Sequence, residues 1–216
     1  MKKVILLLIC FTLALGALTS CGDRKYDEAE VKAAAKKLIE ESIILNEIYW
    51  GDGLPYVEDK NTSDGVYYMA VDSYHYGLGF KTISELQSLT AKTFSQGYCQ
   101  NINSTLLSGI SDGDKAIILS RYYQKVSVAD GKTPEYIMVN STWEKLLVGE
   151  VEYDYDSIKV THSEGETVYV TINATVTLQN YEPQTREIRI SLVEEADGWK
   201  IDSPTYLTYD KTNINK

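Results

Sequence analysis

The first strong pattern of hydrophobic and polar positions predicts a long amphipathic helix. Apolar residues recur at intervals of three and four positions from Val31 to Tyr49, with lysines and glutamates on many of the positions between them. This spacing gathers the apolar side chains on one face, which we expect to pack on a core. Asp27 and Glu30 stand at the N-cap and third helical positions, and Gly51 marks the end.

A second helix is predicted by the Thr-x-x-Glu capping signature of Thr82 and Glu85. Apolar residues follow it at helical spacing as far as Gly97. The same spacing continues from Tyr98 to Gly109, which indicates either a third short helix or a kinked extension of the second.

The second half of the chain has the periodicity of strands. From Val168 to Leu178, apolar residues alternate with tyrosine, threonine and asparagine, as in a long strand with one buried face. Shorter strand patterns lie within 115–129, 136–139, 187–193 and 199–201. Helices followed by antiparallel strands predict an α+β fold, in which N-terminal helices pack on a curved antiparallel β-sheet.

The N-terminus has the pattern of a signal peptide. Lys2 and Lys3 precede an apolar run from Val4 to Leu18, which is shorter than the roughly 20 residues that a membrane-spanning helix needs. Leu18-Thr19-Ser20-Cys21-Gly22 then resembles the bacterial lipobox. The resemblance implies cleavage after residue 20, a lipid on the Cys21 thiol, a tether over residues 21–26, and attachment to the extracytoplasmic face of the cell membrane.

The charge of the chain narrows the choice of partners. The sequence holds 21 basic and 31 acidic residues; without residues 1–20, which contain Lys2 and Lys3, 19 basic residues face 31 acidic ones, a net charge of −12. Nucleic acid is therefore excluded as a predicted partner, because its binding requires a basic patch. The remaining length fits one domain over 27–207 with a polar tail over 208–216.

A long stretch between the first two helices is a candidate binding loop. From Tyr49 to Phe80 only Val66 to Val71 has the pattern of a strand, and irregular segments of this length in compact domains are often functional. A mobile loop without function is the alternative.

An acidic row is the second candidate surface. If the segment 150–156 is extended, the alternation places valine and tyrosine on one face and the acids on the other. The acids are Glu150, Glu152, Asp154 and Asp156. One interpretation is a solvated face whose charges discourage edge pairing, and the other is a surface that docks a protein partner.

Catalytic and metal-binding patterns are missing from the sequence. It contains no serine-hydrolase elbow, zinc helix, phosphate-binding loop or dinucleotide fingerprint. His75, surrounded by Asp72, Tyr74 and Tyr76, and His162 belong to no ligand-spaced cluster, and Cys99 lies in a helical register that favours a small buried side chain. We therefore predict no cofactor or metal, and we favour a binding domain over an enzyme.

Two resemblances extend these predictions. The element order and the closing run from Glu195 to Ile201, EADGWKI, resemble the NTF2-like, cystatin-like superfamily. That resemblance implies a conical cavity, in which isomerase members use a carboxylate with a tyrosine. The chain is also similar to the cell-wall DL-endopeptidase inhibitor family, on residues that include a helix ending and a following loop. These residues are Tyr49, Trp50, Tyr67, Tyr68, Asp72 and the run Thr93-Phe94-Ser95. Asp52, in the glycine-bearing loop after the helix, is a further candidate contact.

The leading hypothesis is a membrane-anchored extracytoplasmic binding domain that inhibits a cell-wall hydrolase. Its candidate contacts are the loop residues of the inhibitor resemblance, His75 and the acidic row. The alternative is an NTF2-like protein that binds a small ligand or isomerises it with a Tyr/Asp pair.

Overall fold

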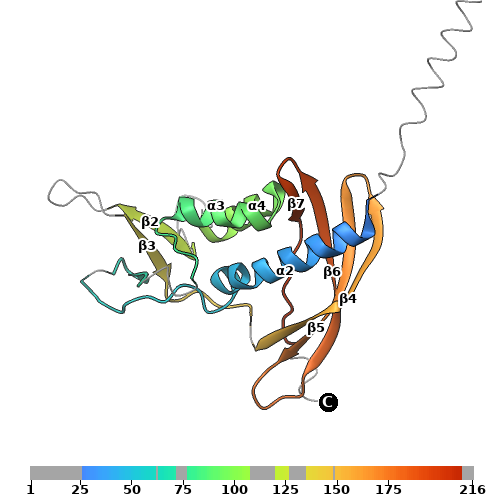
Figure 1. The fold of residues 1–216 in the computed structure, drawn as a ribbon. Helices are drawn as coiled ribbons and strands as arrows, with labels where there is room; N and C mark the ends of the chain where they lie inside the picture. The colour runs from blue at the N-terminus through green and yellow to red at the C-terminus, as the bar shows by residue number, and fades with distance from the viewer. Residues whose placement is uncertain are drawn as a thin grey trace, which may run out of the picture.

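The computed structural model describes residues 26–61, 63–71, 77–107, 120–126, 135–147 and 149–210. The α+β class is confirmed: helices pack on a twisted antiparallel sheet (Figure 1). The helices are α2 (Glu28–Trp50), α3 (Ile83–Thr93), α4 (Gln96–Ile102) and the π-helical turn Asn103–Leu107. The strands are β1 (Tyr67–Met69), β2 (Tyr122–Val126), β3 (Glu135–Asn140), β4 (Glu150–Glu164), β5 (Thr167–Thr177), β6 (Gln184–Glu195) and β7 (Gly198–Ile201).

Helix α2 begins and ends where its sequence predicts. The side chain of Asp27 accepts hydrogen bonds from the backbone N–H groups of Ala29 and Glu30, which would otherwise have no partner in the first turn. At the other end, the Gly51 N–H donates to the carbonyls of Asn46 and Glu47. The apolar face of the helix is buried, and its members are Val31, Ala35, Leu38, Ile39, Leu45, Ile48 and Tyr49.

The predicted capping box opens α3, since the Thr82 side chain accepts from Glu85 N while the Glu85 carboxylate accepts from Thr82 N. The helix stops because Phe94 is extended and forms a parallel bridge with Ile201 of β7. Ser95 then caps α4 through its side chain. Of the two alternatives for residues after 97, a separate short helix is therefore the one observed.

The strands form two sheets, where the sequence predicted one. A four-stranded sheet has the order β4-β5-β6-β7, and a three-stranded sheet has the order β1-β3-β2, all antiparallel. The chain leaves the smaller sheet after β3 because the N–H groups of Leu146 and Leu147 donate to the carbonyl of Trp50 instead of continuing a strand ladder. The chain that links the two sheets is therefore bonded to the end of α2.

The inner face of the larger sheet supplies much of the core. Val168, Val170 and Ile172 of β5 are fully buried, as their alternation predicted, and they belong to the same cluster as the apolar face of α2. On β4, a shift in register between Asp154 and Lys159 changes which positions point inward. Near the start of the strand the odd-numbered residues, such as Val151, are half-buried, whereas farther along the even-numbered Ile158 is buried. The acidic row ends at this bulge.

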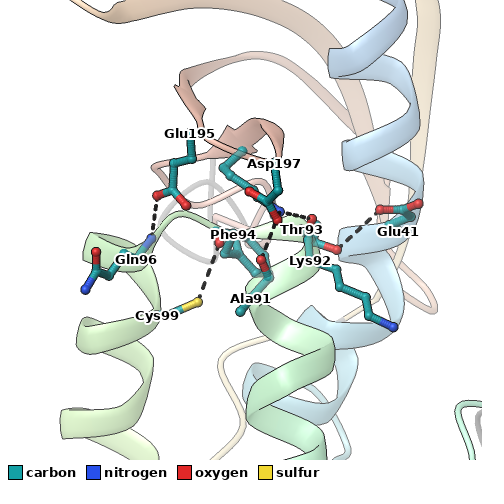
Figure 2. A network of polar contacts seen from close by, with 10 residues as sticks. Glu41, Ala91, Lys92, Thr93, Phe94, Gln96, Cys99, Glu195 and Asp197 are labelled. Atoms are coloured by element: carbon teal, nitrogen blue, oxygen red, sulfur yellow. Dashed lines mark hydrogen bonds and ion pairs between the residues drawn. The ribbon is translucent and has the colours of Figure 1, made fainter.

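The β6–β7 hairpin is fastened to the helices by a buried lysine. Lys200 is 3% exposed, and its ammonium donates to the carbonyls of Ala91 (3.0 Å) and Lys92 (2.8 Å) at the end of α3 and pairs with Asp197 (3.0 Å). Hydrogen bonding to Lys200 lowers the pKa of Asp197. Figure 2 shows the same junction, where Glu195 also accepts from the Gln96 N–H at the start of α4.

We expect Lys200→Met to lower the free energy of unfolding by about 2 kcal/mol, because two helix-terminal carbonyls lose a charged donor. For a domain of this size, that corresponds to a fall in melting temperature of about 4 to 8 °C. Lys159→Met, which removes an exposed lysine of β4, is the matched control and should leave the melting temperature within about 2 °C. Equal melting temperatures for the two variants would contradict this role of Lys200.

Candidate functional site

A pocket of about 410 Å³ lies beside the C-terminal half of α2. Its walls come from α2, from the chain just after it, from the start of β4, and from the segment that follows β7. The lining residues are Ile43, Asn46, Glu47, Asp52, Leu147, Gly149, Glu150, Val151, Tyr153 and Tyr206. Its volume is within the usual range of ligand pockets, about 300–1,000 Å³. The pocket joins the predicted binding loop, through Asp52, to the predicted acidic row, through Glu150.

The end of α2 is held in place by Arg121 and Tyr122 at the start of β2. Arg121 is 3% exposed, and its guanidinium donates to the carbonyls of Tyr49 (2.7 Å) and Gly51 (2.8 Å). The Tyr122 hydroxyl donates to the Ile48 carbonyl at 2.6 Å. These bonds satisfy carbonyl groups that a helix end leaves without partners. They also fix the direction in which the chain leaves α2.

Gly53 allows this close approach. Its φ of +78° lies in the left-handed region, and a Cβ there would stand 2.1 Å from Nη2 of Arg121 and 2.6 Å from the Tyr122 hydroxyl. The glycine of the predicted loop is therefore required both by its backbone conformation and by the arginine that packs over it.

The predicted loop residues around the helix end take different places. Tyr49 is 1% exposed, and its hydroxyl is bonded to that of Thr90 at 2.6 Å, so it is a core residue and not a surface contact. Burial raises the pKa of Tyr49. Trp50 is half-buried and packs on Tyr206, which lines the pocket, with ring centroids 6.1 Å apart. Asp52 lines the pocket itself and pairs with Lys145.

The remaining loop residues lie elsewhere or outside the described ranges. Tyr67 and Tyr68 belong to β1 of the smaller sheet and do not line the pocket. The Tyr67 hydroxyl donates to the Ser120 carbonyl at 2.7 Å, and the Tyr68 ring stacks on Tyr56 with centroids 5.5 Å apart. Asp72, His75 and Cys21 lie outside the residues that the structure describes.

The acidic row is arranged as its alternation predicted. Glu150, Glu152, Asp154 and Asp156 are exposed, while Val151, Tyr153 and Tyr155 between them are half-buried against the core. Strand β4 is an edge of its sheet. Within the described ranges, none of the four carboxylates forms an ion pair. The row is therefore a run of uncompensated negative charge that begins at the pocket.

One of the two pocket tyrosines, Tyr153, is a structural donor. The Tyr153 hydroxyl donates to the Thr205 carbonyl at 3.0 Å. Burial, and secondarily the neighbouring Tyr155, raises the pKa of Tyr153 to about 12, so the phenol keeps its proton at physiological pH. Burial also raises the pKa of Tyr206.

A second cluster of titratable groups surrounds Cys99 at the α3–α4 junction (Figure 2). The thiol lies 3.6 Å from the Phe94 carbonyl, to which it donates. Burial, followed by the charge of Glu195, raises the pKa of Cys99, which is opposite to the shift that activates a nucleophilic cysteine. The residues described by the structure include no group of three or more side chains that could hold a metal ion.

Sequence reasoning missed several residues of this site. Asn46 had a signal, because it is a polar residue within the apolar stripe of α2, and such positions usually bond to something buried. Arg121, Lys145 and Tyr206 had none, since each reaches the site only through tertiary contacts.

No protein family model, curated protein or solved structure matches the chain. None of the helices that the structure describes is both long and apolar enough to cross a membrane.

Proposed function

We propose that this protein is a lipid-anchored extracytoplasmic binding protein that docks a basic surface of another extracytoplasmic protein. The observation that supports it best is the continuity of the acidic row of β4, which forms no ion pair with the described residues, with the pocket, to which Glu150 belongs. We call the acidic row together with the pocket the docking surface. The four carboxylates of the row are exposed, and the rings of Tyr153 and Tyr206 lie at its pocket end.

The energetics of the row favour a role in binding. Carboxylates at alternate positions of one strand lie about 7 Å apart and repel one another. Repulsion of this kind lowers the stability of the free protein, whereas a basic partner would remove it on binding. Complementary charge also accelerates association and suppresses wrong partners.

Proton-transfer chemistry is less well supported by the pocket. An isomerase-type site would need a tyrosine hydroxyl free to donate to a substrate beside a carboxylate. Of the two tyrosines that line this pocket, Tyr153 donates instead to the Thr205 carbonyl, which leaves only the Tyr206 hydroxyl for that role.

The resemblance to cell-wall DL-endopeptidase inhibitors suggests the partner class. We propose an extracytoplasmic cell-wall hydrolase with a basic rim as the docked protein. The NTF2-like assignment and this inhibitor role both stay predictions from the sequence, and the experiments below test the docking itself.

Charge reversal on the acidic row is expected to weaken docking. For a partner captured by crosslinking in cells, Glu152→Lys with Asp154→Lys should reduce affinity by about 10- to 100-fold at low salt, because close charge pairs across an interface couple by about 1.5 kcal/mol or more. The loss should shrink at high salt, where screening weakens both proteins' fields.

The matched control carries the same change in net charge outside β4. Glu166→Lys with Glu182→Lys reverses two exposed acids in other parts of the surface and should retain affinity to within about threefold. His75→Ala should weaken binding much less than the β4 double variant. Equal affinity of the β4 double variant and the parent at low salt would exclude the acidic row as the docking surface.

The lipid anchor is tested by Cys21→Ser. Without the thiol, no thioether to lipid can form, so we expect the variant to accumulate as uncut precursor or to leave the membrane. Fractionation with mass measurement of the intact protein distinguishes these results from the parent. Recovery of the variant in the detergent-soluble membrane fraction at the parent's mature polypeptide mass would contradict lipidation.

A further inference from the structure

We propose that the pocket beside α2 binds one primary ammonium group on an aliphatic stem, as carried by a lysine side chain of the docked partner. The inference rests on the proposed function and names the group that the pocket recognises.

Asn46 provides a hydrogen-bond acceptor fixed toward the pocket. Ser42 Oγ donates its only hydrogen to the Ile39 carbonyl at 2.8 Å, so in the 2.7 Å contact between Ser42 and Thr205 the Thr205 hydroxyl is the donor. Thr205 is then an acceptor toward Asn46, which fixes the amide with its Nδ2 on Thr205 at 2.8 Å.

The other end of this amide is left available. Asn46 is 3% exposed and lines the pocket, and its Oδ1 has no hydrogen-bond partner among the described residues. Among the described residues, the fully buried polar side-chain atoms without a partner are Trp50 Nε1 and Trp143 Nε1, so the Asn46 oxygen is open to the pocket, where a donor can reach it.

The remaining side-chain polar groups are also mostly acceptors. Three carboxylates line the pocket, those of Glu47, Asp52 and Glu150, and the Tyr206 hydroxyl can donate as well as accept. The Glu47 carboxylate already accepts a hydrogen bond from the Asp52 N–H at 2.7 Å, which fixes this carboxylate at the end of α2. A head group with several donors and positive charge fits this set, and a carboxylate or phosphate does not.

The apolar walls match a hydrocarbon stem. Ile43, Leu147 and Val151 line the pocket together with the rings of Tyr153 and Tyr206. Lysine side chains commonly bury their methylene groups along such surfaces while the ammonium reaches polar groups, and aromatic rings attract a nearby cation.

Lys145 of this chain already places an ammonium group on one of the pocket carboxylates. Its ammonium is bonded to Asp52, and the two side chains are 47% and 72% exposed. Lys145 itself is not among the residues that line the pocket, so it holds Asp52 from the rim. A ligand ammonium at Asp52 would compete with Lys145, and removing Lys145 should strengthen binding.

The test uses the full chain purified in detergent at low ionic strength, with calorimetric titration by three probes. N-acetyl-lysine amide should bind saturably, whereas N-acetyl-norleucine amide, which has no ammonium, and N-acetyl-arginine amide, whose planar head group is larger, should bind at least about fivefold more weakly. Asp52→Asn should weaken lysine-amide binding by about three- to fivefold, and Lys145→Gln should strengthen it by about two- to threefold. Glu166→Gln, an exposed acid outside the pocket, is the control and should bind like the parent.

Absence of saturable binding by the lysine probe, or equal binding of the norleucine or arginine probe, would overturn the inference. So would unchanged affinity in both Asp52→Asn and Lys145→Gln. These failures are separate from failure of the docking proposal, which is measured on Glu152 and Asp154, two residues that do not line the pocket. If the charge reversal at Glu152 and Asp154 weakens partner capture but no probe binds, docking by the acidic row is retained and the lysine pocket is excluded. If the lysine probe binds but the charge reversal has no effect on capture, the pocket is retained and the acidic row is excluded.

Discussion

Replacing Arg121 by alanine is expected to lower the free energy of unfolding by about 3 to 5 kcal/mol, a large part of the roughly 5 to 15 kcal/mol that stabilises a domain. The guanidinium donates to the carbonyls of Tyr49 and Gly51 and to the Tyr122 hydroxyl, all within the protein interior. Its removal leaves two buried carbonyls without donors, each of which costs about 1 to 3 kcal/mol.

Chemical denaturation with the parent as reference measures this loss. Arg189→Ala, which removes an exposed arginine of β6, should change the free energy of unfolding by less than about 0.5 kcal/mol. Arg121→Lys keeps the charge but cannot span two carbonyls as a planar fork does, so we expect it to recover less than half of the loss. If Arg121→Ala were as stable as Arg189→Ala, the role of Arg121 in stabilising the end of α2 would be disproved.

Because Arg121 fixes the chain at Gly51, its loss should also disturb the pocket. Asp52 follows that residue directly and lines the pocket. Where Arg121→Ala still folds, we therefore expect weaker binding of N-acetyl-lysine amide than in the parent, although Arg121 itself does not line the pocket.

Ile172→Asp is expected to unfold the domain at ambient temperature or to lower its stability by several kcal/mol. Ile172 is fully buried on the inner face of β5, opposite Ile188 of β6, and it belongs to the main core cluster. A carboxylate at this position would have neither water nor a charge partner, which is among the most costly single changes in a core.

The matched control inserts the same carboxylate on the outer face of the same sheet. Thr185→Asp places it at an exposed position of β6, where we expect a change of less than about 1 kcal/mol. Circular dichroism during thermal unfolding distinguishes the two variants. A melting temperature of Ile172→Asp within about 2 °C of the control would show that the Ile172 side chain does not point into the core.

The sequence by itself determined those features that depend on neighbouring residues. The capping box of Thr82 and Glu85, the N-cap at Asp27 and the alternation of β5 all follow from local geometry, in which the partners are two to four positions apart. The acidic row was predictable for the same reason, since a strand directs alternate side chains to opposite faces.

Only the tertiary structure decided where these features meet. Asn46, Asp52, Glu150 and Tyr206 line one pocket although the chain between the first and last of them contains most of the domain. The division into two sheets and the burial of Tyr49 likewise depend on bonds to distant residues, those from Leu146 to Trp50 and from Tyr49 to Thr90. Periodicity reports which face of an element is apolar, but the partner of that face is set by packing and by hydrogen bonds between segments far apart in sequence, which no local pattern encodes.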